Sequence, residues 1–112
     1  NSLLLTETHL YVTIYSNMND VKEIANLIAK MNTADDICGF LSEMLTESEL
    51  SVLSKRWRII NMLKQGATQR EVSKELSVSL CKVTRGAKIL KNNASVTNRY
   101  LIKEKNYGNK KA

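Results

Sequence analysis

The stretch that most constrains the fold of this chain runs from Thr68 to Lys91 and has the pattern of two short helices joined by a tight turn. Thr68 can cap the first helix, and Glu71, three residues later, can complete a capping box. Ser79 suits the N-cap of the second helix. A capped helix, a three-residue turn and a second capped helix predict a helix-turn-helix, whose second helix is able to enter the major groove of DNA.

The side chains of these two helices divide into apolar and cationic faces. Val72 and Leu76 lie one turn apart on the first helix. On the second helix, four apolar residues at helical spacing are expected to face inward: Leu80, Val83, Ala87 and Leu90. Four basic residues recur every three positions on another side: Lys82, Arg85, Lys88 and Lys91. Any small bundle with a solvated lysine row shows this spacing, but the caps, the turn and the charge together favour DNA binding.

The composition is that of one modest helical domain. The chain has 112 residues, no proline and only four glycines, which favours helices. Its formal net charge of +6 alone indicates only solubility and non-specific attraction to polyanions. The placement of charge says more, because residues 55–91 hold ten Lys or Arg and two Glu, whereas residues 20–49 are acidic. This polarity predicts a nucleic-acid face in the second half and packing or dimer contacts in the first.

Enzymatic and membrane functions are not indicated by the sequence. Cys38 and Cys81 have no metal-ligand spacing and are expected to be free thiols of a cytoplasmic protein. His9 is the single histidine and there is no glycine-rich phosphate loop, so neither a metal site nor catalysis is predicted. No segment reaches transmembrane length, and the apolar residues 3–15 lack the basic leader of a signal peptide.

The chain is expected to divide into an arm, a domain and a tail. The N-terminal arm covers residues 1–17, the helical domain 18–106 and the basic tail 107–112. Within the arm, residues 10–15 have strand propensity. The arm is either a start-site extension before Met18 or a dimerisation arm, and the sequence leaves both readings open.

Four further helices are expected around the predicted helix-turn-helix. They run from a cap at Asn19 or Asp20 to about Met31, from Ala34 to about Met44 with Thr33 as cap, from a cap at Thr46 to about Lys64, and from about Ala94 to Lys105. In the helix from Thr46 to about Lys64, five apolar residues are expected to face inward: Leu50, Leu53, Trp57, Ile60 and Leu63. Gly66 suits a C-cap position after it. The first two have apolar faces wider than a minimal three-helix domain can cover, which predicts a homodimer.

Several short runs between Phe40 and Lys91 carry a family resemblance. They are Met44-Leu45-Thr46, Lys55-Arg56-Trp57-Arg58-Ile59-Ile60, Leu63-Lys64, Gln69-Arg70-Glu71 and Val83-Thr84-Arg85-Gly86. With these runs the chain closely resembles the tryptophan repressor family. The resemblance implies an all-helical, intertwined homodimer with six helices per chain, which acts as a transcriptional repressor on double-stranded operator DNA with L-tryptophan as corepressor.

The resemblance also implies a corepressor pocket. Thr46 and Arg85 match the positions that meet the ligand carboxylate, and Arg56 and Arg85 match the two guanidinium planes that sandwich the indole. Gly86 matches the position that keeps the pocket wall thin near the ring. Judged from the residues alone, the two arginines could instead bind phosphates or pair with upstream glutamates.

The ammonium end of this pocket departs from the family pattern. The backbone carbonyls of Glu43 and Leu45 match the family's ammonium acceptors. Where tryptophan-responsive members place a serine, however, this chain has Ile89, which accepts no hydrogen bond, and the neighbouring asparagine is Lys88. The loop between Lys64 and the next helix is also one residue shorter than in the best-known members of the family. DNA binding is therefore expected to carry over from the family more strongly than tryptophan binding.

The DNA contacts are predicted residue by residue. The eight predicted contact residues are Gln69, Arg70, Ser73, Leu80, Cys81, Lys82, Thr84 and Lys91. By family match Gln69 and Arg70 reach phosphates and base edges, and Lys82 is expected to meet a phosphate or a guanine. The aromatics that would stack on RNA bases are missing from this region, which counts against the alternative of an RNA or protein adaptor.

Overall fold

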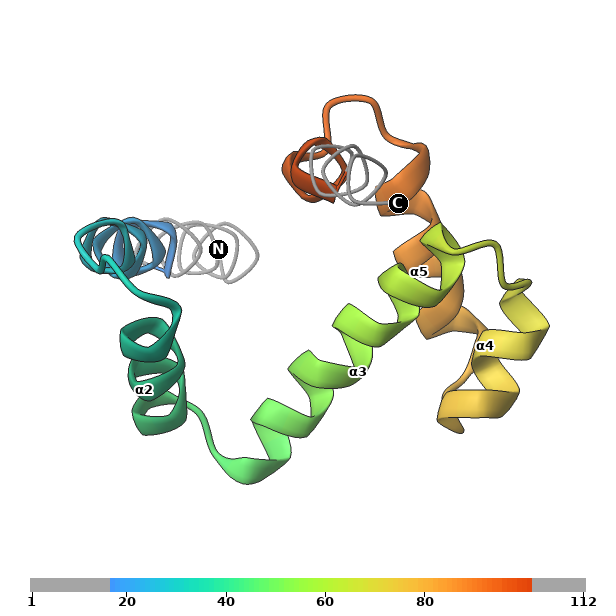
Figure 1. Ribbon diagram of the computed structural model, residues 1–112, viewed down its shortest axis with the longest axis horizontal. Helices are drawn as coiled ribbons and strands as arrows, with labels where there is room; N and C mark the ends of the chain where they lie inside the picture. The colour runs from blue at the N-terminus through green and yellow to red at the C-terminus, as the bar shows by residue number, and fades with distance from the viewer. Residues whose placement is uncertain (1–16, 102–112) are drawn as a thin grey trace, which may run out of the picture. The chain divides into compact units, whose positions relative to one another are not determined.

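The computed structural model describes residues 17–101, and this part of the chain is entirely helical, with six helices and no strand (Figure 1). The helices are residues 17–29, α2 (Ala34–Met44), α3 (Glu47–Lys64), α4 (Gln69–Leu76), α5 (Leu80–Lys91) and residues 96–101. The predicted all-helical class is confirmed. The predicted strand at 10–15 and the basic tail at 107–112 lie outside the described residues.

The chain separates into two compact units, residues 1–46 and residues 47–112. The described part of the first unit holds the helix over 17–29 and α2. Thr33 caps α2, because its Oγ1 accepts a hydrogen bond from the Asp36 N–H at 3.1 Å, as predicted. The predicted cap at Asn19 or Asp20 is wrong: both residues lie inside the helix, which already includes residue 17.

No residue between 17 and 46 is buried. Four apolar side chains of the first helix are strongly exposed: Met18, Val21, Ile24 and Leu27. The apolar face predicted for this helix therefore exists in the sequence, but no described residue of its own unit covers it. An apolar stripe of this size on a short helix requires a packing partner.

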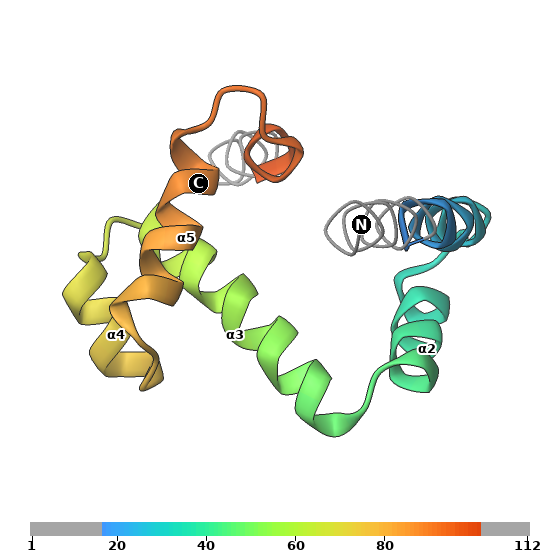
Figure 2. The same cartoon turned by 180° about the vertical axis from the view of Figure 1, so that it is seen from behind.

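The second unit has a small core of its own. Its centre is Ile59, Val72 and Val83, which are exposed by 2% or less. One of these residues comes from each of α3, α4 and α5, and the three helices pack against one another, as Figures 1 and 2 show from opposite sides. The core therefore fixes the position of α5 relative to α3 and α4.

The inward stripe predicted for α3 is only partly correct. Ile60 is buried and Leu50 and Leu63 are half-buried, but Leu53 and Trp57 are 45% and 46% exposed. Within the unit, α4 and α5 are the helices that pack on α3, and they cover the side that carries Ile59 and Ile60. Helical spacing identifies an apolar face, but the neighbouring elements decide which part of that face is buried.

Gly66 ends α3 in the predicted way. Its φ of 106° lies in the left-handed region, which glycine adopts without a Cβ penalty. The Gly66 N–H donates to the Leu63 carbonyl at 3.1 Å, and the Ala67 N–H donates to the Met62 carbonyl at 3.0 Å. These two bonds form a Schellman motif, which satisfies the last carbonyls of α3 and turns the chain toward α4.

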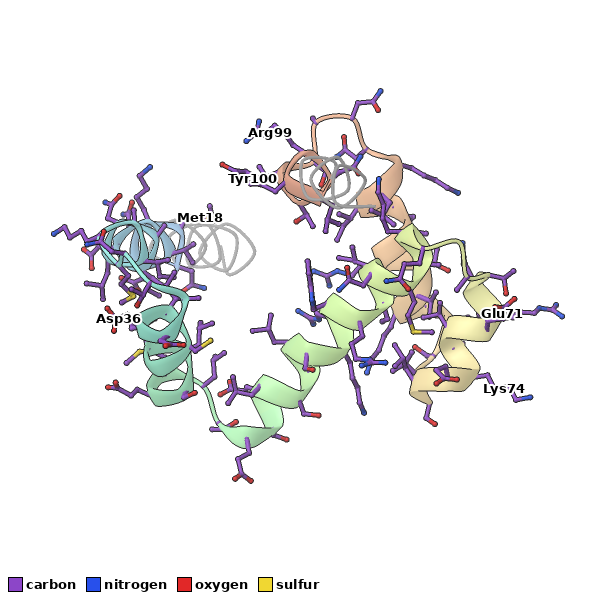
Figure 3. All side chains as sticks on the ribbon, in the orientation of Figure 1. Met18, Asp36, Glu71, Lys74, Arg99 and Tyr100 are labelled. Carbon is purple, nitrogen blue, oxygen red and sulfur yellow. The ribbon has the colours of Figure 1, made fainter. Side chains whose placement is uncertain are left out.

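The last described helix begins at residue 96, two residues later than predicted. Ser95 Oγ accepts from the Asn98 N–H at 3.1 Å and so takes the N-cap position, while Ala94 donates its N–H to Asn92 Oδ1 in a local turn. Asn98 also donates to the Leu90 carbonyl, and Leu101 is buried. On the outer surface of this helix, the Arg99 guanidinium lies 5.6 Å from the Tyr100 ring centroid (Figure 3).

Candidate functional site

The pair formed by α4 and α5 is built by two caps and a three-residue turn. Thr68 Oγ1 accepts from the Glu71 N–H at 3.1 Å, and Ser79 Oγ accepts from the Lys82 N–H at 3.4 Å. Both predicted N-caps are confirmed. The Glu71 and Lys74 side chains point to the side of α4 that faces away from α5 (Figure 3).

The turn itself is fixed by Ser73. Ser77 has a φ of 53°, in the left-handed region, and the Val78 N–H donates to the Ser73 carbonyl at 3.1 Å. The Ser73 hydroxyl in turn donates to the Val78 carbonyl at 2.6 Å. Ser73 was predicted as a DNA contact, and the structure gives its hydroxyl a role within the turn. A hydroxyl that closes a turn in this way holds the second helix at a set angle to the first.

One face of α5 is packed and the other is open. Val83, Gly86 and Ala87 are buried against the rest of the unit. The exposed face carries the predicted cationic row and two neighbours: Cys81, Lys82, Thr84, Arg85, Lys88 and Lys91. Leu80 was expected to face inward and is instead 49% exposed, because it is the first residue of α5 and precedes the part of the helix that packs on α3.

A hydrogen bond joins the two helices at this open face. The Thr84 hydroxyl donates to Gln69 Oε1 at 3.2 Å. Gln69 is the first residue of α4, so the bond ties the start of α4 to the middle of α5. With its oxygen engaged, the Gln69 amide keeps its two N–H donors for an external acceptor. The predicted contact Arg70 lies next to it and is exposed.

A cavity of about 290 Å³ lies between α3, the turn and the first half of α5. Eight residues line it: Ser51, Val52, Lys55, Arg56, Ile59, Val78, Lys82 and Arg85. Arg56 and Arg85, which the resemblance assigns to a ligand, both belong to this lining. Five lining residues were not predicted as site residues: Ser51, Val52, Lys55, Ile59 and Val78. A usable signal was present on α3, where Ser51, Lys55 and Ile59 recur every fourth position and so share one face.

Gly86 lies behind this cavity. A Cβ at Gly86 would come within 2.7 Å of Ile59 Cγ2, so the absence of a side chain allows α5 to approach α3 closely. Ile59 itself lines the cavity, so the close approach of α5 at Gly86 helps to fix the position of this lining residue. Ile89 is half-buried and is not part of this lining.

The other residues of the predicted ligand site belong to the first unit. Glu43 is exposed in the last turn of α2, and Leu45 follows as the C-cap, with its N–H bonded to the Leu41 carbonyl at 2.9 Å. Thr46 is exposed just before α3. Their role at a ligand stays a prediction.

Two features of the described residues bear on other classes of function. Between residues 17 and 101, no three His, Cys, Asp or Glu side chains are grouped so that they could hold a metal ion. In the same range, no helix has the length and apolar character needed to cross a bilayer. Cys38 and Cys81 are both free and exposed.

These features define a small all-helical domain with a capped pair of short helices, an open cationic face and a neighbouring cavity. Residues 19–105 match the family described as Trp repressor protein. The Trp operon repressor homolog of Xylella fastidiosa (strain M23) is 39% identical over 71 residues, which cover 62% of this chain and 77% of that protein. The homolog from Chlamydia caviae is 31% identical over 77 residues, or 68% and 76% of the two chains. The chain belongs to the Trp repressor family, a family of DNA-binding transcriptional repressors.

Proposed function

We propose that this protein is a sequence-specific transcriptional repressor that binds operator DNA in the cytoplasm as a homodimer. In this proposal α4 and α5 form a helix-turn-helix, and α5 enters the major groove. The observation that carries the proposal is the division of α5 into a face packed by Val83, Gly86 and Ala87 and an open face with four basic residues. A helix held rigidly by its core side and cationic on its free side is suited to a DNA groove.

Four other positions support the same surface: Gln69 is half-buried, and Arg70, Leu80 and Cys81 are exposed. Gln69, which is bonded to Thr84, presents amide donors at the start of α4, next to Arg70. Arginine reads guanine edges with paired hydrogen bonds, and the Gln69 amide N–H groups suit an acceptor on a base or phosphate. Leu80 and Cys81 are exposed at the start of α5, and apolar groups there suit thymine methyls. The surface therefore combines base-reading groups with phosphate-binding charges.

The homodimer is supported by apolar side chains that stay exposed in the part of a single chain that the structure describes. They lie on the helix over 17–29 and on α3: Met18, Val21, Ile24, Leu27, Val52, Leu53 and Trp57. A second copy would bury these faces and place two α5 helices for successive major grooves, about 34–36 Å apart on a roughly palindromic site.

The cavity beside α5 is the proposed effector site. Arg56 and Arg85 line it together, and planar guanidinium groups can stack on a flat ligand and bind its acid group. A ligand held there contacts α3 and α5 at once, and so affects the angle of the DNA-binding helix. By family match L-tryptophan is expected to bind this chain weakly, because Ile89 stands where tryptophan-responsive members place a serine that accepts from the ligand ammonium.

Selection of bound duplexes from a random pool, followed by affinity measurements at several salt concentrations, tests the proposed function. Arg70→Ala and Lys82→Ala should each weaken binding and lower the slope of log K against log salt by about one. Lys22→Ala removes the same charge from the helix over 17–29 and serves as the control. If no sequence is enriched, or if both variants keep the parental slope, this surface does not bind DNA.

A further inference from the structure

The side chains that line the cavity beside α5 carry a strong excess of positive charge. Four of the eight are cationic, namely Lys55, Arg56, Lys82 and Arg85, and none is acidic. The other four are one hydroxyl, Ser51, and three aliphatic side chains, Val52, Ile59 and Val78. The lining therefore combines concentrated positive charge with an apolar wall.

We infer that this cavity binds a small dianionic ligand with a compact apolar body and no ammonium group, a dicarboxylate or a phosphate monoester carried on a ring. The inference rests on the proposed function, since it names the chemistry of the proposed effector. It departs from a zwitterionic amino acid, whose ammonium would face the same four cations.

Electrostatics favours two negative charges over one. A monoanion offers a single charge to four cations that are held around one small volume, and a zwitterion adds repulsion at its ammonium end. Lys82 lies in the first turn of α5, where the helix dipole adds further positive potential. Arginine and lysine both bind carboxylate and phosphate oxygens through charge-assisted hydrogen bonds. A dianion can engage the α3 pair and the α5 pair at the same time.

The size and the apolar wall define the rest of the ligand. A volume of about 290 Å³ lies at the lower limit for small-molecule pockets, which suits a single ring with its acid groups. Ile59 is 2% exposed and belongs to the core, so it provides a rigid apolar floor for the body of the ligand. An inorganic anion would leave this floor unused.

Titration calorimetry of the full chain in phosphate-free buffer at pH 8 tests the inference. Phenyl phosphate, which is a dianion at this pH, or benzene-1,2-dicarboxylate should bind at least about tenfold more tightly than L-tryptophan. Comparing these two probes separates a phosphate from paired carboxylates as the preferred anion. Inorganic phosphate should bind at least about tenfold more weakly than phenyl phosphate, since it lacks the ring.

Lys55 allows the site to be tested apart from DNA binding. It lines the cavity but is not among the proposed DNA contacts. Lys55→Gln should weaken binding of the preferred dianion by about fivefold, and Lys55→Arg should retain it. Lys74→Gln makes the same charge change on α4, outside the cavity, and should change nothing. Circular dichroism of each variant reports whether the helices remain folded.

Four outcomes would overturn the inference: tryptophan binding as tight as either dianion, inorganic phosphate binding as tight as phenyl phosphate, no effect of Lys55→Gln, or no dianion binding below about 1 mM. Binding to the selected duplex without ligand is measured in parallel. If the duplex binds and the dianions do not, the inference fails alone. If the dianions bind and no duplex does, the proposed function fails.

Discussion

The two units of this chain carry similar apolar patterns but bury them very differently. In the second unit, Ile59, Val72 and Val83 are exposed by 2% or less, and they join three helices around one core. In the first, no residue between 17 and 46 is buried, although Val21, Ile24 and Leu27 repeat at helical spacing. The same kind of pattern thus gives a core in one unit and an open apolar face in the other.

The difference shows which contacts each unit requires. The helices α3, α4 and α5 cover one another, so the proposed DNA-binding pair is positioned within a single chain. No residue of the two described helices of the first unit is buried, and we expect their stability to depend on another surface. We therefore expect changes in the second unit to act within the chain, and changes in the first to act through association of two copies.

The largest expected effect is at the core of the second unit. Ile59→Ala removes most of a side chain that is 2% exposed, and should lower the free energy of unfolding by about 2–5 kcal/mol. Urea unfolding at fixed protein concentration measures it. Ser54→Ala, at an exposed position of the same helix, should stay within about 0.5 kcal/mol. A small loss for Ile59→Ala would mean that this unit lacks an independent core.

The next effect concerns the open face of the first unit. Ile24→Lys places an ammonium group on the apolar stripe, and should raise the dissociation constant of the dimer at least about a hundredfold because that charge has no partner when buried. Sedimentation equilibrium measures the dissociation constant. Asn26→Lys introduces the same charge on the opposite face of the helix and is the control. A dimer that tolerates Ile24→Lys would show that this stripe is not the interface.

A smaller loss in the free energy of unfolding is expected for a substitution at the point where α5 approaches α3. In Gly86→Ala the added methyl would lie 2.7 Å from Ile59 Cγ2, closer than side chains in a packed core can approach. The resulting shift should cost about 1–3 kcal/mol in urea unfolding. It should also weaken DNA binding beyond the loss of stability, because α5 moves relative to α4. Gly39→Ala, whose added Cβ meets no atom within 4 Å, provides the comparison.

Local features of the fold were predictable from the sequence. The caps at Thr33, Thr68 and Ser79 depend on a side chain and an N–H group three residues apart, and all three are present. The prediction failed where burial depends on distant parts of the chain. Leu53 and Trp57 have the correct spacing for a core, but the helices that pack on α3 cover another side of it.

The candidate site shows the same division. The cationic row on α5 follows from spacing alone, whereas the cavity could not be derived from one helix, because its lining comes from α3, the turn and α5. The family resemblance assigned Arg56 and Arg85 to the ligand, whereas Lys55, in the same run as Arg56, was given no ligand role. Ser73 was predicted as a DNA contact because the sequence does not show the acceptor of its hydroxyl. That acceptor, the Val78 carbonyl, becomes available only once the turn has formed.

The smallest expected effect comes from comparing one helix N-cap from each unit. Thr33 and Thr68 each accept a backbone hydrogen bond at 3.1 Å, so the two caps are matched in geometry. Thr68→Ala should cost about 1 kcal/mol in the parental chain and also in the Ile24→Lys background, because its unit keeps its own core. Thr33→Ala should cost about the same in the dimer and close to nothing in that background, since its unit has then lost its packing partner. Urea unfolding followed by circular dichroism gives all four values, and an equal cost for Thr33→Ala in both backgrounds would show that residues 17–46 keep their structure without a second copy.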